Sequence, residues 1–487
     1  MSFYQFLHKS FLQYGEREAL IDQFSGKRLT YKDLEQEVSG WANYLNRKGI
    51  RKGDRVVYIH TNSLEHVILF LACSKIGALF VPMNWRLGVA EIDEILNEVD
   101  AKIIFYKDKC ELTNRKEEFI DVLSLSHLKE VSEDIPKHEI SLNEPLLMLY
   151  TSGTTGKPKG VLLHGSMLQS NILNTVEQWG LREGDRTIVE TPFFHTGGYN
   201  VLLLPLLSVG GTCILAEKFD VSNFYKTLKV EKLSVYFGVP TMFQHICENP
   251  EFESADFKTM RFLISGGAYC SEQLISTYQK KQLVFKQGFG LTEVGPNCFL
   301  LKEEDAIRKI GSIGQPMPHS KVRLMADGRE AKVGEVGELL LGGPHVCRGY
   351  YKNSEGFESS LTGEYFKTGD LARKDEEGFY YIEGRKKDMY ISGGENVYPA
   401  EVEGKLAKHE FIDEAVVVAQ SDEKWGEVGV AFYRGKRDID LKELREFLNP
   451  ILSRYKHPHR IVRLEEFPLL DNGKVNRIFL KESVTNY

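Results

Sequence analysis

Apolar and polar positions follow two different periods along the first hundred residues. Apolar side chains at helical spacing predict one helix over 34–45 and a second over 64–76. Short apolar runs at 56–59 and 103–106 are typical of buried strands. Strands that alternate with helices in this way predict an α/β fold with a mostly parallel sheet.

The same alternation recurs over 146–290, and the pattern changes after it. Over 311–381 glycines become frequent and apolar runs short, which predicts antiparallel hairpins or a small barrel-like subdomain. The last hundred residues carry their own helix and strand signals, sufficient for a small α+β domain. The charged segment GRKKD at 384–388 is the predicted boundary, so the domains are expected to span 1–384 and 385–487.

Composition and charge exclude several classes of protein. The chain has 487 residues, of which 42% are hydrophobic and 27% charged, and this balance excludes a mostly disordered protein. Its 62 basic and 69 acidic residues leave a net charge of −7, so no basic field would draw it to nucleic acid. Any polyanion that it binds must therefore be held by local groups.

The cysteine spacing and the apolar stretches indicate the cellular location of the protein. The seven cysteines are odd in number, scattered and never spaced C-x-x-C, which argues against a zinc ribbon or disulfide framework and favours a cytoplasmic location. The first ten residues lack the apolar core of a signal peptide. The longest apolar stretch, 199–216, is interrupted by Pro205 and Gly210. It therefore predicts a buried helix, a turn and a strand, and no transmembrane segment.

The segment YTSGTTGKPKGV at 150–161 is the most informative part of the sequence. It follows an apolar run, which places it in a loop that leaves a strand. Backbone N–H groups of such a loop can converge on an anion, and glycine allows the close approach that this needs. Hydroxyl and lysine side chains add donors and positive charge, so phosphate is the expected ligand. The spacing does not fit a Walker loop, because Gly156 and Lys157 are followed by Pro158.

This loop resembles the signature of the adenylate-forming superfamily, which contains acyl- and aryl-CoA synthetases, firefly luciferase and the adenylation domains of peptide synthetases. Further segments resemble other motifs of the same family: QGFGLTE at 287–293, YFKTGDL at 365–371 and PLLDNGKVNR at 468–477. They occur in the family order, and the resemblance extends over essentially the whole chain. It implies a layered αβαβα N-terminal domain, a small mobile C-terminal domain and adenylating activity.

The resemblance assigns nucleotide and metal roles to residues in these motifs. Asp370 would accept hydrogen bonds from the ribose hydroxyls, and Thr292 would contact phosphate. Glu293 would hold Mg²⁺, whose preference for oxygen ligands suits a carboxylate. Phe289 departs from the family pattern, which usually has Tyr there, and Leu470 stands in place of Thr or Ser. The residues expected to bind ATP or AMP are Thr151, Ser152, Gly153, Thr154, Thr155, Lys159, Gly266, Gly267, Ala268, Gly288, Phe289, Gly290, Asp370, Ile382 and Arg385.

Catalytic, hinge and coenzyme roles follow from the same resemblance. Lys474 would bridge the attacking carboxylate and the α-phosphate of ATP, where negative charge gathers. Lys387 would be the hinge about which the C-terminal domain rotates, and Gly393 and Gly394 would give room to the pantetheine arm of coenzyme A. The implied enzyme uses ATP, Mg²⁺ and coenzyme A. A carboxylate attacks the α-phosphorus and releases pyrophosphate, and a thiol then displaces AMP.

Acyl specificity is the part that the sequence constrains least. Peptide-synthetase domains usually carry an Asp that binds the α-ammonium group of their substrate, whereas the matching segment PFFHTGGY has His195. This favours an acid without an α-amino group, and the resemblance places His195 near the reacting carboxylate. Mostly apolar or aromatic pocket walls favour a hydrophobic aliphatic or aromatic acid. The residues expected to form these walls are Tyr199, Asn200, Tyr236, Gly238 and Val239.

Four other interpretations remain open. An acyl-carrier protein could replace coenzyme A as the acceptor after the same first step, or the adenylate could be oxidised as in luciferase. The chain could also bind nucleotide without catalysis, although Lys474 and Glu293 are both present. His409 and Asp413 have the spacing of H-x-x-x-D acyltransferases, but no Gly follows Asp413. A homodimer is allowed, and the expected partners are otherwise a carboxylic acid, ATP and coenzyme A.

Overall fold

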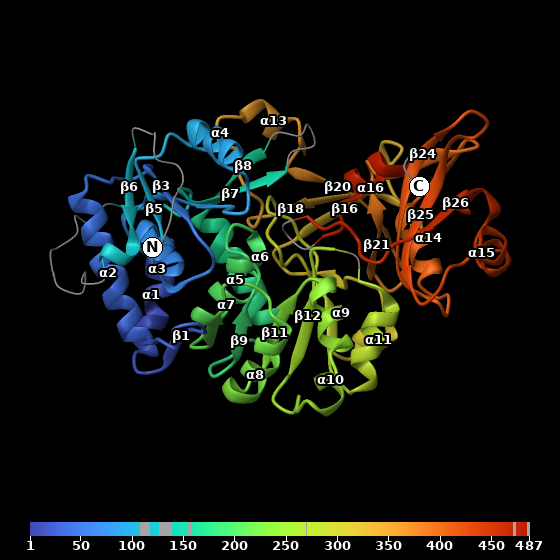
Figure 1. Ribbon diagram of the computed structural model, residues 1–487. Coiled ribbons are helices and arrows are strands. Elements are labelled where there is room, and N and C mark those ends of the chain that lie inside the picture. Colours follow the sequence, from blue (N-terminus) through green and yellow to red (C-terminus); the bar gives the residue numbers. More distant parts are fainter. Residues whose placement is uncertain (108–116, 126–138, 153–157, 269, 471–473, 485–487) are drawn as a thin grey trace.

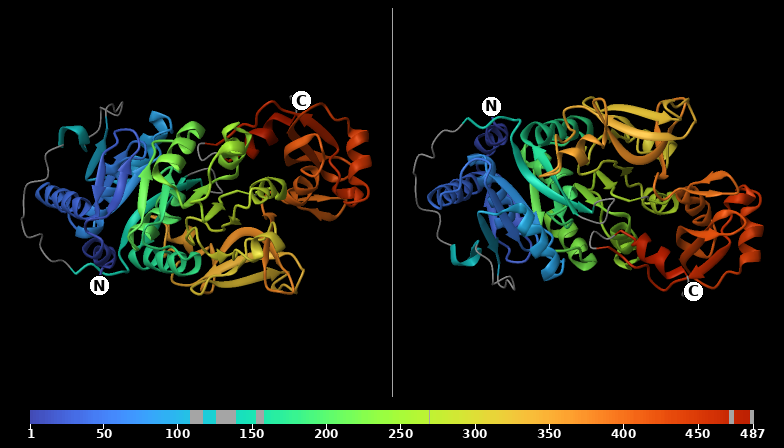
Figure 2. Two further views of the ribbon diagram at one scale, coloured as in Figure 1. Left: turned by 90° about the horizontal axis from the view of Figure 1, so that it is seen from below. Right: turned by 90° about the horizontal axis from the view of Figure 1, so that it is seen from above.

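The computed structural model describes residues 1–107, 117–125, 139–152, 158–268, 270–470 and 474–484. Helices and strands alternate through a large N-terminal part, and the last hundred residues form a separate lobe at the other end of the molecule (Figure 1). The views from below and above show the same separation (Figure 2). The predicted α/β class is confirmed.

Among the described residues, the first sheet has six strands, and β8 pairs antiparallel with β7 whereas the other five run parallel. The predicted strands at 56–59 and 103–106 are confirmed as β3 and β5. In spatial order the strands are β6 (Glu118–Asp121), β5 (Ile103–Tyr106), β3 (Arg55–Ile59), β4 (Leu79–Met83), β7 (Pro145–Ser152) and β8 (Pro158–His164).

The second sheet consists of two hydrogen-bonded groups of strands. One group is β2 (Arg28–Thr30), β1 (Glu18–Asp22), β10 (Thr212–Leu215) and β9 (Arg186–Val189), and the other is β11 (Val235–Gly238), β12 (Phe262–Ser265) and β13 (Phe285–Gln287). The backbone N–H of Ser234 donates to the carbonyl oxygen of Arg186 at 2.9 Å, which connects β9 to β11. Apart from β2, the paired strands run parallel.

Helices cover both faces of each sheet, which produces five layers. In β3, Val56 and Tyr58 face the central layer between the sheets, whereas Val57 faces α4 (Val89–Val99) on the outside. Strands buried on both faces are apolar at successive positions, as these are. The central layer includes α1 (Phe3–Gln13), α2 (Tyr31–Arg47), α3 (Leu64–Ile76), α5 (Gly165–Trp179) and α7 (Leu203–Leu207). The outer face of the second sheet is covered by α8 (Val221–Glu231), α9 (Pro240–Glu248) and α11 (Glu272–Lys280). The implied αβαβα order is therefore confirmed.

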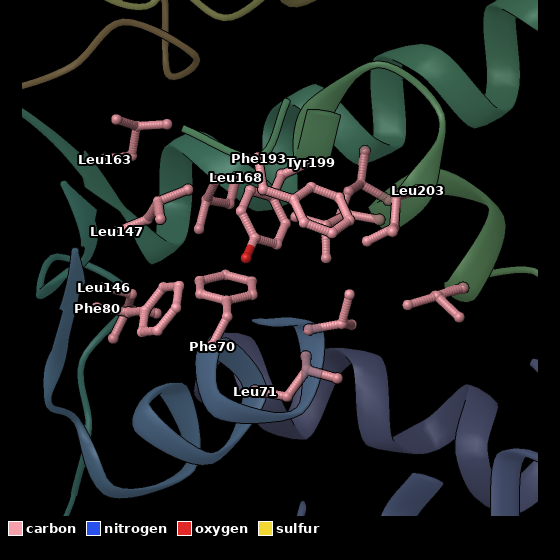
Figure 3. Close-up of a cluster of buried hydrophobic side chains, with 14 of the residues drawn as sticks. Phe70, Leu71, Phe80, Leu146, Leu147, Leu163, Leu168, Phe193, Tyr199 and Leu203 are labelled. Atoms are coloured by element: carbon pink, nitrogen blue, oxygen red, sulfur yellow. The ribbon is translucent and has the colours of Figure 1, made fainter. Parts of the chain in front are cut away.

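Aromatic side chains fill the central layer, as Figure 3 shows for Phe70, Phe80, Phe193 and Tyr199. The rings of Phe193 and Tyr199 stack with centroids 4.6 Å apart. The apolar stretch 199–216 joins this layer as the end of α6 (Thr196–Asn200), α7 and β10, so the predicted order of helix, turn and strand is confirmed. Within the described residues, no helix combines the length and apolar character that a membrane crossing requires.

The region predicted to form hairpins is an antiparallel sheet beside the layered body. It is built from β17 (Arg329–Glu330), β16 (Lys321–Ala326), β18 (Gly337–Gly342), β20 (Tyr365–Lys374), β19 (Leu361–Thr362) and β21 (Tyr380–Arg385). Its strands pair with antiparallel register throughout. The long hairpin of β20 and β21 matters most here, because it carries three predicted nucleotide residues, Asp370, Ile382 and Arg385, and leads into the C-terminal lobe.

The C-terminal lobe has its own hydrophobic clusters. Two ion pairs attach it to the outer helices of the second sheet: Lys408 Nζ lies 3.3 Å from Glu272 Oε2, and Arg434 Nη2 lies 3.2 Å from Glu248 Oε1. The boundary at 384–388 stays a prediction. The lobe contains β22 (Tyr390–Ser392), β23 (Glu395–Val397), α14 (Pro399–Leu406), β24 (Ile412–Asp422), β25 (Gly426–Gly435), α15 (Leu441–Leu448), β26 (Arg460–Arg463) and α16 (Arg477–Ser483).

Candidate active site

Three strand ends meet at one edge of the second sheet. Gly238 of β11 pairs with Ser265 of β12, and Ser265 pairs with Gln287 of β13. The segments that follow these residues therefore leave the sheet side by side. Two of them are the SGGA loop (265–268), which contains the predicted nucleotide residues Gly266, Gly267 and Ala268, and the QGFG loop (287–290). Ligands of open parallel sheets bind outside the carboxyl ends of the strands. Parallel pairing thus brings together motifs that are separate in the sequence.

The C-terminal lobe brings Lys474 to this edge. A Cβ atom built on Gly267 would lie 3.7 Å from Cε of Lys474 and 3.6 Å from Cγ1 of Val239. Burial lowers the pKa of Lys474, and the positive charge of Arg385 lowers it further, whereas the negative charge of Asp370 raises it. The ammonium group therefore lies among the residues predicted to bind nucleotide.

Asp370 and Arg385 face each other across β20 and β21. They are register partners, and Nε of Arg385 lies 2.8 Å from Oδ1 of Asp370. The other carboxylate oxygen, Oδ2, is buried without a hydrogen-bond partner among the described residues. Burial raises the pKa of Asp370 to about 6, against the lowering effect of Arg385 and Lys474. A buried carboxylate with one unsatisfied oxygen can accept hydrogen bonds from a ligand.

Glu293 lies in a tight turn after the QGFG loop. The turn is closed by a bridge between Leu291 and Gly295, and a Cβ atom on Gly290 would lie 2.1 Å from the carbonyl oxygen of Gly295. The hydroxyl of Tyr350 donates to Oε1 of Glu293 at 3.2 Å. Burial raises the pKa of Glu293, while the Tyr350 hydrogen bond and the charges of Arg385 and Lys159 lower it. The sequence alone did not indicate Tyr350.

The predicted phosphate loop connects β7 to β8. Thr151 and Lys159 are register partners at its base, and Nζ of Lys159 lies 5.0 Å from the centroid of the Tyr350 ring. Lys159 therefore projects from the base of the loop toward the Glu293 turn. Three predicted nucleotide contacts, Gly153, Thr154 and Thr155, lie outside the described residues, as does the side chain of Ser152.

His195 lies at the start of α6, where the end of the second sheet meets the central layer. Its Nε2 atom is buried, and no described residue supplies it with a hydrogen-bond partner. Burial lowers the pKa of His195 to about 4, and the charges of Lys474 and Arg86 lower it further. The imidazole is therefore neutral at physiological pH, and Lys474 is one of the two positive charges that act on it.

Two residues predicted to line the acyl pocket belong to the packed core instead. Tyr199 is fully buried, and its hydroxyl donates to the carbonyl oxygen of His66 at 3.2 Å. Tyr236 is also fully buried, on the outer face of the sheet, and its hydroxyl donates to Glu190. Neither side chain borders an open space, because each is enclosed by other side chains of its layer.

Phe237 follows Tyr236 in β11, and its ring lies on the other face of the strand. A Cβ atom on Gly197 would lie 3.0 Å from the Phe237 ring, and one on Gly266 would lie 3.2 Å from it. The ring therefore lies between the His195 loop and the SGGA loop. Neighbouring residues of β11 point to opposite faces, so the Phe237 ring lies on the side of the sheet opposite to Tyr236. Val239, another predicted wall residue, lies on the site side next to Gly267.

The burial of Glu190 makes the stability of the protein depend on pH. Tyr236 OH lies 2.9 Å from Glu190 Oε2, and burial raises the pKa of Glu190 from its usual 4.5 to about 8. The folded protein therefore holds this proton while the unfolded chain releases it, so the free energy of unfolding falls as pH rises from 4.5 to 8. We expect Glu190→Gln to unfold at a higher temperature than the parent at pH 8, with little difference at pH 5. Thermal melts at both pH values test this, and an equal difference at both would contradict it.

The remaining predicted residues lie as follows. Asn200 is buried, and its Nδ2 donates to Thr196 Oγ1 at 3.0 Å. Lys387 is exposed in the turn after β21, and its role as a hinge stays a prediction. Thr292 is half-buried in the Glu293 turn. Phe289 packs edge-on to Phe299 with centroids 5.7 Å apart, and Ile382 of β21 packs against the large hydrophobic core. Gly267 and Ala268 are exposed, and Gly266, Gly238, Gly288 and Gly290 are buried or half-buried.

Gly393 and Gly394 form the two-residue turn between β22 and β23. Their φ angles are +61° and +88°, so both lie in the left-handed region that this hairpin turn requires. A Cβ atom on Gly393 would also lie 2.7 Å from the indole of Trp425. The local fold therefore needs glycine here for its own reasons, and the role of the pair toward coenzyme A stays a prediction.

The residues present fit a magnesium ion that arrives with the nucleotide. Glu293 supplies a hard carboxylate oxygen within a group of positive charges. In the described part of the chain, no cluster of three or more His, Cys, Asp or Glu side chains could hold a metal by itself. Mg²⁺ usually keeps several waters and binds through one or two carboxylates together with substrate phosphates.

Family models match both parts of the chain. The AMP-binding enzyme model matches residues 7–351, and the model of the AMP-binding enzyme C-terminal domain matches residues 401–474. The chain belongs to the AMP-binding enzyme family. The resemblance inferred from the motifs is thus confirmed over both of its parts.

Several relatives of known name are similar over nearly their full length. A feruloyl-CoA synthase from Amycolatopsis is 36% identical over 92% of this chain and 93% of its own. An indoleacetate–CoA ligase from Aromatoleum aromaticum is 34% identical over 95% of this chain and 94% of its own. Among solved structures, the o-succinylbenzoate CoA synthetase of Bacillus subtilis in complex with its acyl-adenylate is 29% identical, with a TM-score of 0.87 over 98% of this chain and 97% of that chain.

Proposed function

We propose that this protein activates a hydrophobic aliphatic or aromatic carboxylic acid with ATP and transfers the acyl group to coenzyme A. In the first step a carboxylate oxygen attacks the α-phosphorus, and the bond to pyrophosphate breaks. In the second step the thiol attacks the carbonyl carbon of the acyl-adenylate, and the bond to AMP breaks. The observation that carries the proposal is the position of Lys474 beside Gly267, within the electrostatic reach of Asp370 and His195.

Charge neutralisation explains the first step. Negative charge gathers at the α-phosphate as the carboxylate approaches, and a cation already in place lowers the energy of that arrangement. Lys474 would supply this charge, and Lys159 would hold the outer phosphates. The free oxygen of Asp370 would accept hydrogen bonds from the ribose hydroxyls. Mg²⁺ held by Glu293 would neutralise charge on the phosphate oxygens.

The surroundings of His195 favour a hydrophobic acid. The imidazole is neutral and offers no charge that would hold an α-ammonium or a second carboxylate. Phe237 and Val239 add apolar surface on the site side of β11. Relatives named for ferulate and indoleacetate act on aromatic acids, which supports the same choice.

Phe237→Ala is expected to change which acid is used and to leave the use of ATP nearly unchanged. Removing the ring enlarges the space between the His195 loop and the SGGA loop, and differences in pocket volume are worth about tenfold or more in discrimination. We expect the ratio of kcat/KM for a bulky acid to that for a small one to rise about tenfold, with KM for ATP within about twofold. Tyr236→Phe is the matched control on the opposite face of β11, and it should leave the ratio unchanged. An unchanged ratio in Phe237→Ala would remove this residue from the pocket.

Pyrophosphate release over a panel of acids tests the proposed function. The panel contains fatty, arylalkanoic, cinnamic-type, dicarboxylic and α-amino acids, each with and without coenzyme A. We expect release of pyrophosphate with hydrophobic acids and formation of AMP and an acyl-CoA when coenzyme A is present. Adenylate without thioester would indicate another acceptor, such as a carrier protein, and a preference for amino acids would contradict the proposal.

A further inference from the structure

One segment, 345–351, lies between β8, which carries Lys159, and the Glu293 turn, and it is hydrogen-bonded to both. On the side of the phosphate loop, Tyr350 forms a bridge with Val161 of β8. The backbone N–H of Tyr351 donates to the carbonyl oxygen of Gly160 at 2.7 Å, next to Lys159. The backbone of this segment is therefore hydrogen-bonded along β8, the strand that carries Lys159.

The same segment also fixes the Glu293 turn. The backbone N–H of Cys347 donates to the carbonyl oxygen of Glu293 at 2.7 Å. The Nδ1 atom of His345 lies 2.5 Å from the carbonyl oxygen of Val294. These two contacts hold the backbone of the turn, and neither touches the Glu293 carboxylate.

The side chain of Tyr350 makes the two contacts that reach functional groups. Its hydroxyl donates to Oε1 of Glu293 at 3.2 Å, and its ring lies under Nζ of Lys159, 5.0 Å from the centroid. The ring is 6% exposed and packs edge-on against Phe357 with centroids 5.5 Å apart. Packing therefore requires the ring, whereas the hydroxyl interacts with the Glu293 carboxylate and also with the side chain of Ser360.

We infer that Tyr350 is a positioning residue that orients the Glu293 carboxylate through its hydroxyl and the Lys159 ammonium through its ring. A carboxylate held by one hydrogen bond presents its remaining lone pairs in a fixed direction, which favours a metal that tolerates little distortion. A cation over an aromatic face is likewise confined. This inference rests on the proposed function, because it assigns Glu293 to Mg²⁺ and Lys159 to phosphate.

Two substitutions at the same position separate the hydroxyl from the ring. Tyr350→Phe removes the hydrogen bond and keeps the ring, and Tyr350→Leu removes both. Tyr351→Phe is the matched control, because the hydroxyl of Tyr351 donates to the carbonyl oxygen of Val99 at 3.0 Å, away from the Glu293 carboxylate. Thermal melts of all three variants establish that they fold.

The first measurement is the binding of Mn²⁺, as a spectroscopic substitute for Mg²⁺, to the protein with a non-hydrolysable ATP analogue, followed by electron paramagnetic resonance. We expect Tyr350→Phe to weaken Mn²⁺ binding about two- to tenfold, the effect of losing one hydrogen bond. In the absence of metal, the affinity for the analogue should stay within about twofold of the parent in Tyr350→Phe. It should weaken about two- to tenfold in Tyr350→Leu, which lacks the ring under Lys159. Tyr351→Phe should match the parent in both measurements.

The second measurement is the Mg²⁺ dependence of adenylation with an accepted acid. In Tyr350→Phe, saturating Mg²⁺ should restore kcat to within about twofold of the parent, because the carboxylate is misdirected but present. Unchanged Mn²⁺ binding in Tyr350→Phe, or a loss of kcat that Mg²⁺ does not restore, would overturn the inference. Failure of the proposed function would appear differently, as no pyrophosphate release by the parent with any acid, and the metal-binding measurement does not depend on that result.

Discussion

Replacing Lys474 with alanine should slow formation of the acyl-adenylate by about two to three orders of magnitude. Thioester formation from acyl-adenylate supplied to the enzyme should stay within about threefold of the parent. The ammonium group lies against the SGGA loop and within the field of Asp370. Negative charge gathers at the α-phosphate in the first step. The second step forms a neutral thioester and releases AMP, which is a good leaving group without help from a cation. Losing the Lys474 ammonium group is therefore expected to slow the first step and not the second.

Single-turnover pyrophosphate release measures the first step, and conversion of the pre-made adenylate with coenzyme A measures the second. Lys481→Ala is the matched control, because Lys481 is an exposed residue of α16 in the same lobe. It should leave both rates unchanged. Equal losses in both steps for Lys474→Ala would mean that the residue acts by holding the lobe in place and not on the reacting phosphate.

The second large effect is expected at Asp370, where asparagine should raise KM for ATP about ten- to hundredfold. The substitution keeps the shape of the side chain and removes the charge that strengthens its hydrogen bonds. It also leaves the Arg385 guanidinium without its ionic partner, and a charged hydrogen bond of this kind is worth about 1.5–3 kcal/mol. Asp375→Asn in the same hairpin is the control, because Asp375 pairs with Lys309 at 2.7 Å.

The pH dependence of the same residue gives an independent measurement. Burial raises the pKa of Asp370 to about 6, so its carboxylate is ionised above pH 6 and becomes protonated below it. A protonated carboxyl accepts hydrogen bonds weakly, so kcat/KM for ATP should fall as pH decreases through 6. Phosphate groups of ATP titrate near the same pH, and their contribution remains in Asp370→Asn. A profile that is identical in parent and variant would show that Asp370 does not contribute to the acid limb. His195 remains neutral over this range because burial lowers its pKa to about 4.

Elements with strong local signals were predicted closely. The helix expected over 64–76 is α3, Leu64–Ile76, because Ser63 caps its first turn and Gly77 ends it with φ of 78°. The strand expected over 103–106 is β5. Such boundaries depend on residues adjacent in the chain, so the sequence alone can locate them.

Contacts between segments that are distant in the sequence could not be predicted in this way. The choice between Tyr236 and Phe237 depends on which face of β11 is turned toward the site. Both faces of that strand are buried, so its side chains are apolar on each and the pattern does not distinguish them. Tyr350 is separated from Glu293 and from Lys159 in the sequence, and the approach of all three follows from the packing of segment 345–351 against β8 and the Glu293 turn.

The sequence by itself determined the α/β class and the motifs that carry adenylating chemistry, because each depends on residues that are near one another in the chain. The tertiary structure decided which of these motifs share one site. It joined Asp370 to Arg385 through strand register, and it brought Lys474 to Gly267 through the docking of the C-terminal lobe. Register and docking are long-range interactions, whose energies come from surfaces that form only when the whole chain is folded.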